Sequence, residues 1–424
     1  MKYNALKGVE DILPPDSAVW NRIESAARAV FYRYGFQEIR IPIIEPTEIF
    51  TRSIGEATDI VEKEMYTFPD KAGRSITLRP EGTAPAVRCY VEHSLSGLPS
   101  PQKFFYAGPM FRYERPQKGR FRQFYQIGVE AFGVAQPSLD AEMLVMLKHV
   151  LEAIGLRELA FELNSIGDEA CRPAYRDALL RFFGDRLPEL CPDCQRRYST
   201  NPLRIFDCKV ERCMELRRGA PEVTSFLCAP CREHFDELLS RLEAFGIPYA
   251  LNPNLVRGLD YYKRTVFEVT SEHLGAQKAV AAGGRYDRLV KEFGGPETPA
   301  IGFAMGMERI AALVKELSGE PVPSPKVFVA TLGRDAEREG FKLAEELRAD
   351  GCWIEANYGG VSLKSQMRKA DRIGAEIVLI LGEDELSAGK IGWKNLRDGS
   401  QGEIDRAGLK ELFPRGSCKR NGGA

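Results

Sequence analysis

The residues best suited to chemistry lie in one stretch, residues 103–133, whose two halves are rich in aromatic and β-branched side chains. This composition predicts two β-strands, and the polar residues between Arg112 and Phe121 predict the loop of a long antiparallel hairpin. Side chains alternate along a strand, so the second strand has one apolar face and one polar face. The polar face holds Arg122, Gln126, Gly128 and Glu130.

This polar face has the length of a binding site. A strand rises about 3.3 Å per residue, so Arg122 and Glu130 are expected to stand about 25 Å apart. That span suits a small molecule joined to a polyanion, and Gly128 leaves room between the two ends. The alternative is that this is only the solvated face of a surface hairpin. The presence of Gln126 and Glu130 on either side of Gly128 argues against it.

The hairpin sequence FRYERPQKGRFRQFYQIGVE resembles motif 2 of the class II aminoacyl-tRNA synthetases, and in detail the histidyl-tRNA synthetase family of subclass IIa. Other segments are similar to the same family: LRPEGTAP at 78–85, LVRGLDYYKRTVFEV at 255–269, AAGGRYDRLV at 281–290 and, as motif 3, IGFAMGMERI at 301–310. The resemblance covers essentially the whole chain.

The resemblance implies activation of an amino acid by ATP with Mg²⁺, in which a carboxylate attacks the α-phosphate. Guanidinium groups suit this reaction because they stay charged and bind phosphate at two points. The resemblance places Arg112 and Arg257 beside the α-phosphate as catalytic groups. It places Arg120 and Arg309 with Arg112 in the ATP site.

A histidine pocket must complement an imidazole, which in its neutral form offers one donor and one acceptor. A carboxylate and a phenol provide such a pair. By resemblance the histidine-binding residues are Glu81, Gly82, Thr83, Arg112, Gln126, Glu130, Arg257, Tyr261 and Tyr262. Two alternatives stay open from the residues alone: a plain helix cap at Glu81 to Thr83, and core packing for one of the two adjacent tyrosines.

The elements around these residues indicate more than one domain, as 424 residues suggest. Apolar spacing predicts a helix over 16–34, and alternation predicts a strand over 36–46; in class II synthetases this pair forms motif 1 and the dimer interface. The resemblance implies an α+β catalytic domain over 1–322, with an antiparallel sheet flanked by helices. A small cysteine-rich insertion domain over 168–250 interrupts it.

Residues 325–413 alternate strand-like and helical segments, which predicts a small α/β domain with a largely parallel sheet. The domain resembles the anticodon-binding domain of class IIa synthetases. The tail over 414–424 is expected to be disordered.

Six of the ten cysteines lie between Cys191 and Cys231 and include two C-x-x-C knuckles. Two such knuckles can hold one tetrahedral Zn²⁺, so a structural zinc on Cys191, Cys194, Cys228 and Cys231 is one hypothesis. Reduced, packed cysteines are the alternative, because many family members hold no metal here.

The net charge of −1 limits nucleic-acid contacts to local basic patches. The sequence has no apolar run of membrane-spanning length and no signal-peptide core, so we expect a cytoplasmic protein without a membrane partner.

The expected function is histidine–tRNA ligase, a homodimer acting on L-histidine, ATP and histidine tRNA. The chief alternative is the non-catalytic, histidine-binding regulatory subunit of ATP phosphoribosyltransferase. That family usually lacks the last domain and erodes the RGLDYY segment and motif 3, which are present here. A third hypothesis, a zinc-containing RNA-binding module, leaves the face with Gln126 and Glu130 unused.

Overall fold

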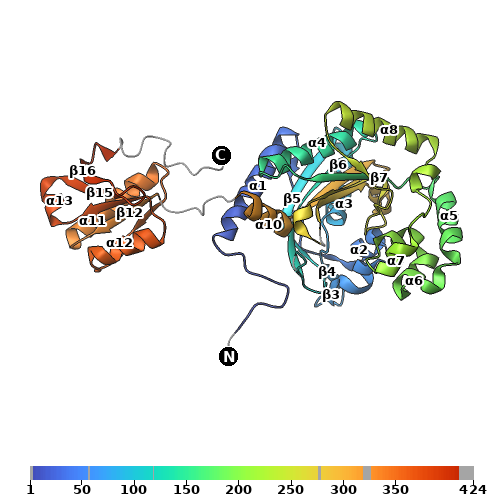
Figure 1. The fold of residues 1–424 in the computed structure, drawn as a ribbon, viewed down its shortest axis with the longest axis horizontal. Coiled ribbons are helices and arrows are strands. Elements are labelled where there is room, and N and C mark those ends of the chain that lie inside the picture. Colours follow the sequence, from blue (N-terminus) through green and yellow to red (C-terminus); the bar gives the residue numbers. More distant parts are fainter. Residues whose placement is uncertain (1–2, 56–57, 118, 276–277, 319–325, 410–424) are drawn as a thin grey trace. The chain divides into compact units, whose positions relative to one another are not determined.

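A computed structural model describes residues 3–55, 58–117, 119–275, 278–318 and 326–409. The chain divides into two compact units, residues 1–319 and 320–424, which are described separately below (Figure 1). Among the described residues, no helix is both long enough and apolar enough to cross a bilayer.

An eight-stranded sheet forms the centre of the first unit, in the order β1-β5-β6-β11-β10-β9-β7-β8. Its neighbours pair antiparallel except for β1 with β5 and β7 with β8. The strands are β1 (Gln37–Glu38), β5 (Gln102–Phe111), β6 (Gln123–Phe132), β7 (Ala160–Ser165), β8 (Ala250–Leu251), β9 (Lys263–Thr270), β10 (Ala279–Arg285) and β11 (Ala300–Gly306). The predicted hairpin is therefore confirmed as β5 and β6, joined by residues 112–122.

Four long helices cover one face of this sheet and enclose the main core (Figure 1). They are α1 (Asp16–Arg33), α4 (Pro137–Ala153), α8 (Ala229–Ala244) and α10 (Met307–Ser318). Ile127, Val129 and Ala131 of β6 point into this core, as their alternation predicted. The other face of β6, which carries Glu130, is thereby left to the site.

The opposite face is covered near Glu130 by α3 (Thr83–Glu92), with α9 (Leu289–Glu292) beside it. Pro85 lies in the first turn of α3, where a missing N–H breaks no helical hydrogen bond. Tyr90 of α3 stacks on Phe132 of β6 with ring centroids 4.4 Å apart. This packing fixes the start of α3 over the polar face of the hairpin.

The strand predicted over 36–46 is wrong as a single element. The chain forms β1 and then β2 (Ile44–Pro46), which joins a separate sheet with β4 (Ser75–Leu78) and β3 (Tyr66–Pro69). The break falls at Ile41 and Pro42, whose carbonyls accept hydrogen bonds from Arg79 Nη1 at 2.8 and 3.2 Å. Pro42 has no N–H to give to a ladder, so a side chain replaces strand pairing there.

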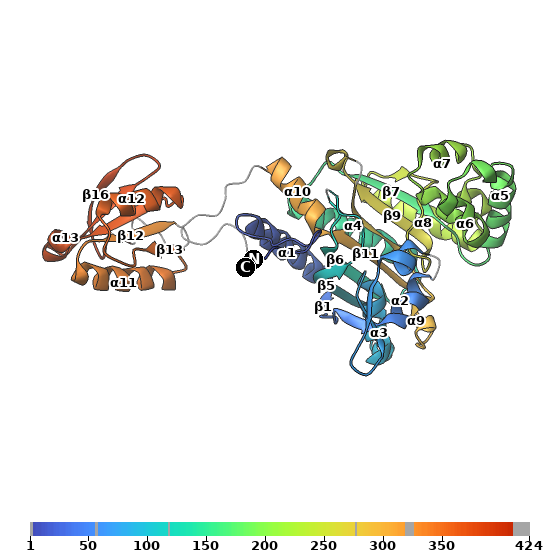
Figure 2. The ribbon, with the colours of Figure 1, turned by 90° about the horizontal axis from the view of Figure 1, so that it is seen from below.

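Between β7 and β8 the chain forms a group of helices with its own apolar core. They are α5 (Arg172–Gly184), α6 (Pro192–Thr200), the 3₁₀ helix η4 (Pro202–Asp207) and α7 (Glu211–Leu216). Figures 1 and 2 show α5, α6 and α7 gathered at the end of the sheet where β7 lies. The last helix of the segment, α8, instead packs against α4 in the main core.

The second unit has a five-stranded sheet in the order β13-β12-β14-β15-β16. Its strands are β12 (Val327–Thr331), β13 (Ile354–Ala356), β14 (Ile377–Leu381), β15 (Lys390–Asn395) and β16 (Gln401–Asp405). The first three are parallel, as predicted, whereas β15 and β16 add an antiparallel hairpin that the sequence did not predict. Helix α11 (Arg334–Ala349) and helix α12 (Leu363–Arg372) pack on opposite faces. The tail over 414–424 lies outside the described residues.

Candidate active site

The centre of the site is the carboxyl group of Glu130, which is 1% exposed. Its Oε1 accepts hydrogen bonds from Thr83 Oγ1 at 2.8 Å and from Tyr106 Oη at 2.9 Å. Its Oε2 accepts a hydrogen bond from Tyr286 Oη. A buried carboxylate needs such donors, because an unpaired buried charge is costly.

The ring of Tyr106 reaches Glu130 through a slot between two glycines. A Cβ at Gly82 or at Gly128 would lie 2.2 Å from this ring, closer than any real Cβ contact. Gly302 on β11 makes a similar gap, because a Cβ there would meet Glu130 Oε2 at 1.9 Å. The space that Gly128 was expected to leave is thus filled by Tyr106.

Glu81 lies at the entrance of α3 and is also buried. Its carboxylate accepts hydrogen bonds from the backbone N–H groups of Thr83 at 2.7 Å and Ala84 at 2.8 Å. These N–H groups belong to the first turn of α3, where they have no partner inside the helix. Glu81 therefore acts as a helix cap, and it also brings a second carboxyl group near Glu130.

The arginines of the hairpin loop are held by a carboxylate at the other end of the polar face. Glu114 forms ion pairs with Arg120 at 3.1 Å and with Arg112 at 3.9 Å. Arg112 Nε also donates to the carbonyl of Pro80, 2.9 Å away, just before Glu81. Arg112 thus connects the hairpin loop with the segment that caps α3.

Arg257 and Arg309 approach the same area from other segments. Arg257 Nη1 donates to Glu268 Oε2 at 2.7 Å and its guanidinium lies 6.0 Å from the ring centre of Tyr262. Arg309 Nε donates to the carbonyl of Gly119 at 3.1 Å, in the hairpin loop. Burial and the neighbouring charge of Arg120 lower the pKa of Arg309, so Arg309 and Arg120 lie in one cationic group.

Tyr261 and Tyr262 are both buried and in ring contact, with centroids 4.6 Å apart. Both rings belong to one apolar cluster, so core packing describes both tyrosines and neither lies at the surface. Both tyrosines lie close enough to Glu81 and Glu130 for those carboxylates to raise their pKa, after the larger effect of burial. The pKa of Tyr262 rises in this way to about 12.

Four buried polar atoms of the site residues named above have no hydrogen-bond partner among the described residues. Two of them, Nε of Arg257 and Oε2 of Glu114, belong to ion-paired groups, and the other two are the amide oxygen of Gln126 and the hydroxyl of Tyr261. An unpaired buried polar atom in a native protein needs an explanation, and a missing ligand is one. Both were predicted to bind histidine.

The structure also shows residues that sequence reasoning did not assign to the site. They are Tyr106, Glu114, Glu268 and Tyr286, which hold Glu130 or the arginines. Three of them stand inside the quoted segments: Glu114 follows Arg112 by two residues, Glu268 lies near the end of 255–269, and Tyr286 lies within 281–290. Tyr106 gave no signal, because it lies in an apolar stretch of β5.

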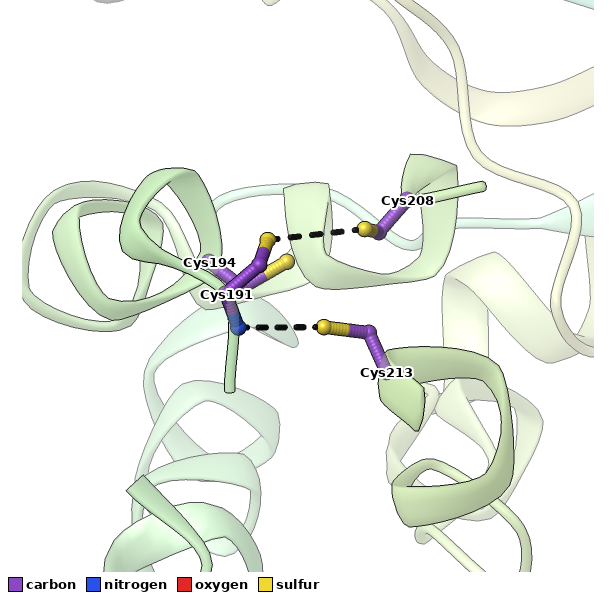
Figure 3. A group of neighbouring side chains, drawn as sticks. All are labelled: Cys191, Cys194, Cys208 and Cys213. Atoms are coloured by element: carbon purple, nitrogen blue, oxygen red, sulfur yellow. Dashed lines mark hydrogen bonds between the residues drawn. The ribbon is translucent and has the colours of Figure 1, made fainter. Parts of the chain in front are cut away.

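The cysteines are not arranged as predicted. The hypothesis joined Cys191, Cys194, Cys228 and Cys231 in one site, but the structure separates the two knuckles. Cys191 and Cys194 gather with Cys208 and Cys213 (Figure 3), whereas Cys228 and Cys231 gather with Asp168 and Cys171. The reason is that the two knuckles lie at the starts of different helices, α6 and α8, and α8 belongs to the main core.

Comparison with known proteins agrees with this geometry. The model of a family described as histidyl-tRNA synthetase matches residues 8–167 and 210–310, and that of an anticodon binding domain matches residues 326–415. The chain belongs to the histidyl-tRNA synthetase family. Both quoted synthetase motifs, 2 and 3, lie within the matched ranges, whereas residues 168–209 lie between them.

Relatives cover nearly the full length. The histidine–tRNA ligase of Thermodesulfovibrio yellowstonii is 54% identical, over 98% of this chain and 99% of its own. The crystal structure of apo S. aureus histidyl-tRNA synthetase superposes with a TM-score of 0.81 at 40% identity, covering 97% of this chain and 100% of that one. A Bacillus halodurans protein described as ATP phosphoribosyltransferase regulatory subunit/histidyl-tRNA synthetase is only 20% identical, with a TM-score of 0.66 over 90% of this chain and 99% of that one; it shares the fold.

The environment of Glu130 predicts a pH-dependent stability. Burial raises the pKa of Glu130 from 4.5 to about 8, although the hydroxyls of Tyr286, Thr83 and Tyr106 oppose the shift. Between these two pH values the folded state keeps a proton that the unfolded chain has lost, so stability falls as the pH rises from 4.5 to 8. We expect the melting temperature to decline across this window, and Glu130→Gln to flatten the decline.

Glu158→Gln is the matched control for that measurement, since Glu158 is exposed. Thermal unfolding followed by circular dichroism at each pH compares the three proteins. The same pH profile for Glu130→Gln and the unsubstituted protein would contradict the raised pKa.

Proposed function

We propose that the protein is a histidine–tRNA ligase, which joins L-histidine to AMP at the expense of ATP and then transfers it to the 3′ end of histidine tRNA. The observation that carries the proposal is the arrangement of one face of β6 and its neighbours. A buried carboxyl group with hydroxyl donors lies at one end, and a group of carboxylate-held arginines lies at the other. The histidine–tRNA ligase relative, 54% identical over nearly the whole chain, supports the same reaction.

In this proposal the imidazole of histidine binds between Glu130 and Tyr261. An imidazole N–H can donate to a carboxyl oxygen of Glu130, and the unpaired hydroxyl of Tyr261 can donate to the other ring nitrogen. The buried amide oxygen of Gln126 offers a further acceptor. A site that pairs a distinctive side chain in this way rejects analogues lacking it by about 10⁴-fold or more, so no editing step is required.

The α-amino group of histidine is assigned to Glu81, Gly82 and Thr83. Glu81 supplies negative charge where the amino group is positive, and Thr83 connects Glu81 to Glu130 through its N–H and hydroxyl. Gly82 lacks a side chain because the Tyr106 ring occupies that space. One short segment thereby links the amino-group site to the imidazole site.

Arg112 and Arg257 are assigned to the histidine carboxylate and the α-phosphate, and Arg120 and Arg309 to the rest of ATP. Two anions repel as they react, and fixed cations stabilise the charge that builds up. The substrate carboxylate is already ionised, so positioning and electrostatics suffice without a general base. ATP is expected to arrive with Mg²⁺, whose charge adds to that of the arginines.

The second unit is proposed to bind the anticodon region of histidine tRNA, as its match to an anticodon binding domain supports. A regulatory subunit of ATP phosphoribosyltransferase is less well supported, because this unit and all four assigned arginines are present. A cytoplasmic location, where tRNA, ATP and histidine meet, is part of the same proposal.

The homodimer expected from motif 1 is also a proposal. Short β1 is the edge strand of the large sheet, and Tyr32, Ile43 and Ile44 around it are large apolar side chains exposed to solvent. A second copy would bury such side chains. Their exposure supports this surface as the place of contact.

The reaction is tested by histidine-dependent exchange of labelled pyrophosphate into ATP without tRNA. We expect exchange with histidine and none with the other amino acids, because only the imidazole satisfies both Glu130 and Tyr261. Transfer to tRNA is then measured as labelled histidine on histidine tRNA. Tight histidine binding without any exchange would instead favour the regulatory subunit.

Arg257→Ala is expected to reduce that exchange at least about 100-fold, the scale on which a group that stabilises transition-state charge acts. The variant should stay folded, with a melting temperature close to that of the unsubstituted protein. Arg157→Ala is the control, since Arg157 is exposed and far from the site in sequence. Exchange near the normal rate in Arg257→Ala would remove Arg257 from the catalytic group.

Light scattering tests the dimer. We expect a mass twice that of the 47.5 kDa chain, and a shift toward the single-chain mass in Ile43→Asp, because a buried unpaired carboxylate destabilises an apolar contact. Phe245→Asp, at an exposed side chain beyond α8, serves as the control. A single-chain mass for the unsubstituted protein would contradict the dimer.

A further inference from the structure

We propose that the segment between β7 and β9 binds two zinc ions in two separate sites, one built from four cysteines and one from three cysteines and an aspartate. The four-cysteine site consists of Cys191, Cys194, Cys208 and Cys213. The aspartate site consists of Asp168, Cys171, Cys228 and Cys231. In each group the four ligand atoms lie within 4.8 Å of one another.

The four-cysteine site has the dimensions of a tetrahedral zinc centre. A Zn–S bond of about 2.3 Å sets neighbouring sulfurs of a tetrahedron about 3.8 Å apart. Cys191 Sγ and Cys208 Sγ are 3.8 Å apart (Figure 3). This distance is far longer than the roughly 2.05 Å of a disulfide, and all four of these cysteines are free thiols.

Backbone N–H groups already point at the sulfurs of this site. Cys191 N donates to Cys213 Sγ at 3.3 Å, and Val210 N donates to Cys208 Sγ at 3.4 Å. Such donors stabilise thiolates, which are the form of cysteine that binds a metal. Cys194, Cys208 and Cys213 are buried, so an ion here would be enclosed on most sides.

The aspartate site repeats these features with one oxygen. Asp168 Oδ1 lies 3.5 Å from Cys171 Sγ and 3.8 Å from Cys228 Sγ. Cys228 N donates to Cys171 Sγ at 3.1 Å. Asp168 is held in place by Ala170 N, 3.1 Å from Oδ1, and by Arg264, 3.6 Å from Oδ2.

The two sites connect different parts of the chain. The four-cysteine site joins the start of α6, the residue after η4 and the first turn of α7, within a small core that contains three of its own cysteines. The aspartate site joins the exit from β7, the start of α5 and the start of α8. Small cores are commonly stabilised by a bound metal. The four-cysteine ion would hold α6, η4 and α7 together, and the other ion would hold this group of helices to β7 and α8.

Zinc is the metal that we assign to these two sites. Thiolates in tetrahedral arrangement favour Zn²⁺ or iron over Mg²⁺ or Ca²⁺, and structural zinc sites use four protein ligands with no open position. Five of the eight ligands lie in 168–209, the range that the model of the family does not match. The sites are therefore inferred from this chain's own residues.

The test is the metal content of the full-length protein, purified without chelator and measured by mass spectrometry of the elements. We expect two zinc ions per chain, one in Cys208→Ser, one in Cys231→Ser and none when the two substitutions are combined. Cys89→Ser is the control and should keep two, because Cys89 is a free cysteine outside both sites.

A second measurement uses the unsubstituted protein, so the proposal can be tested even if the substituted proteins fail to fold. X-ray absorption at the zinc edge should show seven sulfurs and one oxygen shared between two ions, with Zn–S near 2.3 Å and Zn–O near 2.0 Å. Two zinc ions with this ligand set support the proposal. Three results would overturn it: no zinc, iron in place of zinc, or a single zinc that either substitution removes.

Discussion

The carboxyl group of Glu130 is the constraint on which the rest of the site depends. It lies in a buried position of β6 and accepts hydrogen bonds from β5, from the first residue of α3 and from Tyr286 after β10. Burying a carboxylate without partners costs several kcal/mol, so these hydroxyls have to be in place for the sheet to close. The same hydrogen bonds require glycine at positions 82, 128 and 302, because a Cβ at any of them would displace Tyr106 or Glu130.

The arginines show a second principle, which is preorganisation by paired charge. Glu114 holds Arg112 and Arg120, and Glu268 holds Arg257, before any phosphate is present. These carboxylates prevent the cations from repelling one another and fix their direction. In the proposed ATP site, an incoming polyanion would compete with the glutamates for the same guanidinium groups and would exchange one set of ion pairs for another.

Local sequence patterns were enough to predict the hairpin, the helix over 16–34, the start of α3 and the alternation of the second unit. Each rests on residues close together in the chain. The same patterns failed at 36–46, where Arg79, more than thirty residues away, supplies the hydrogen bonds that break the strand. They also missed β15 and β16, because Lys, Gly and Asn in β15 and Gly, Glu and Asp in β16 are residue types depleted in strands.

For the site, the quoted segments contained most residues that meet in the structure, but not the contacts among them. Tyr106 looked like part of an apolar strand, because nothing local shows that its ring passes between Gly82 and Gly128. The cysteines failed for a related reason. A C-x-x-C spacing indicates that two thiols belong together, but it carries no information on which distant residues complete the set.

The way the chain leaves and re-enters the large sheet has an evolutionary consequence. Ile166 N donates to Arg264 O at 2.8 Å and Arg264 N donates to Gly167 O at 2.7 Å, so the two ends of the long excursion are paired side by side. The nearly one hundred residues between Gly167 and Arg264 thus leave the sheet and return to it at neighbouring backbone positions. Helices α5 to α7 have a core of their own, so a change in their length or sequence need not alter the strand register beneath the site.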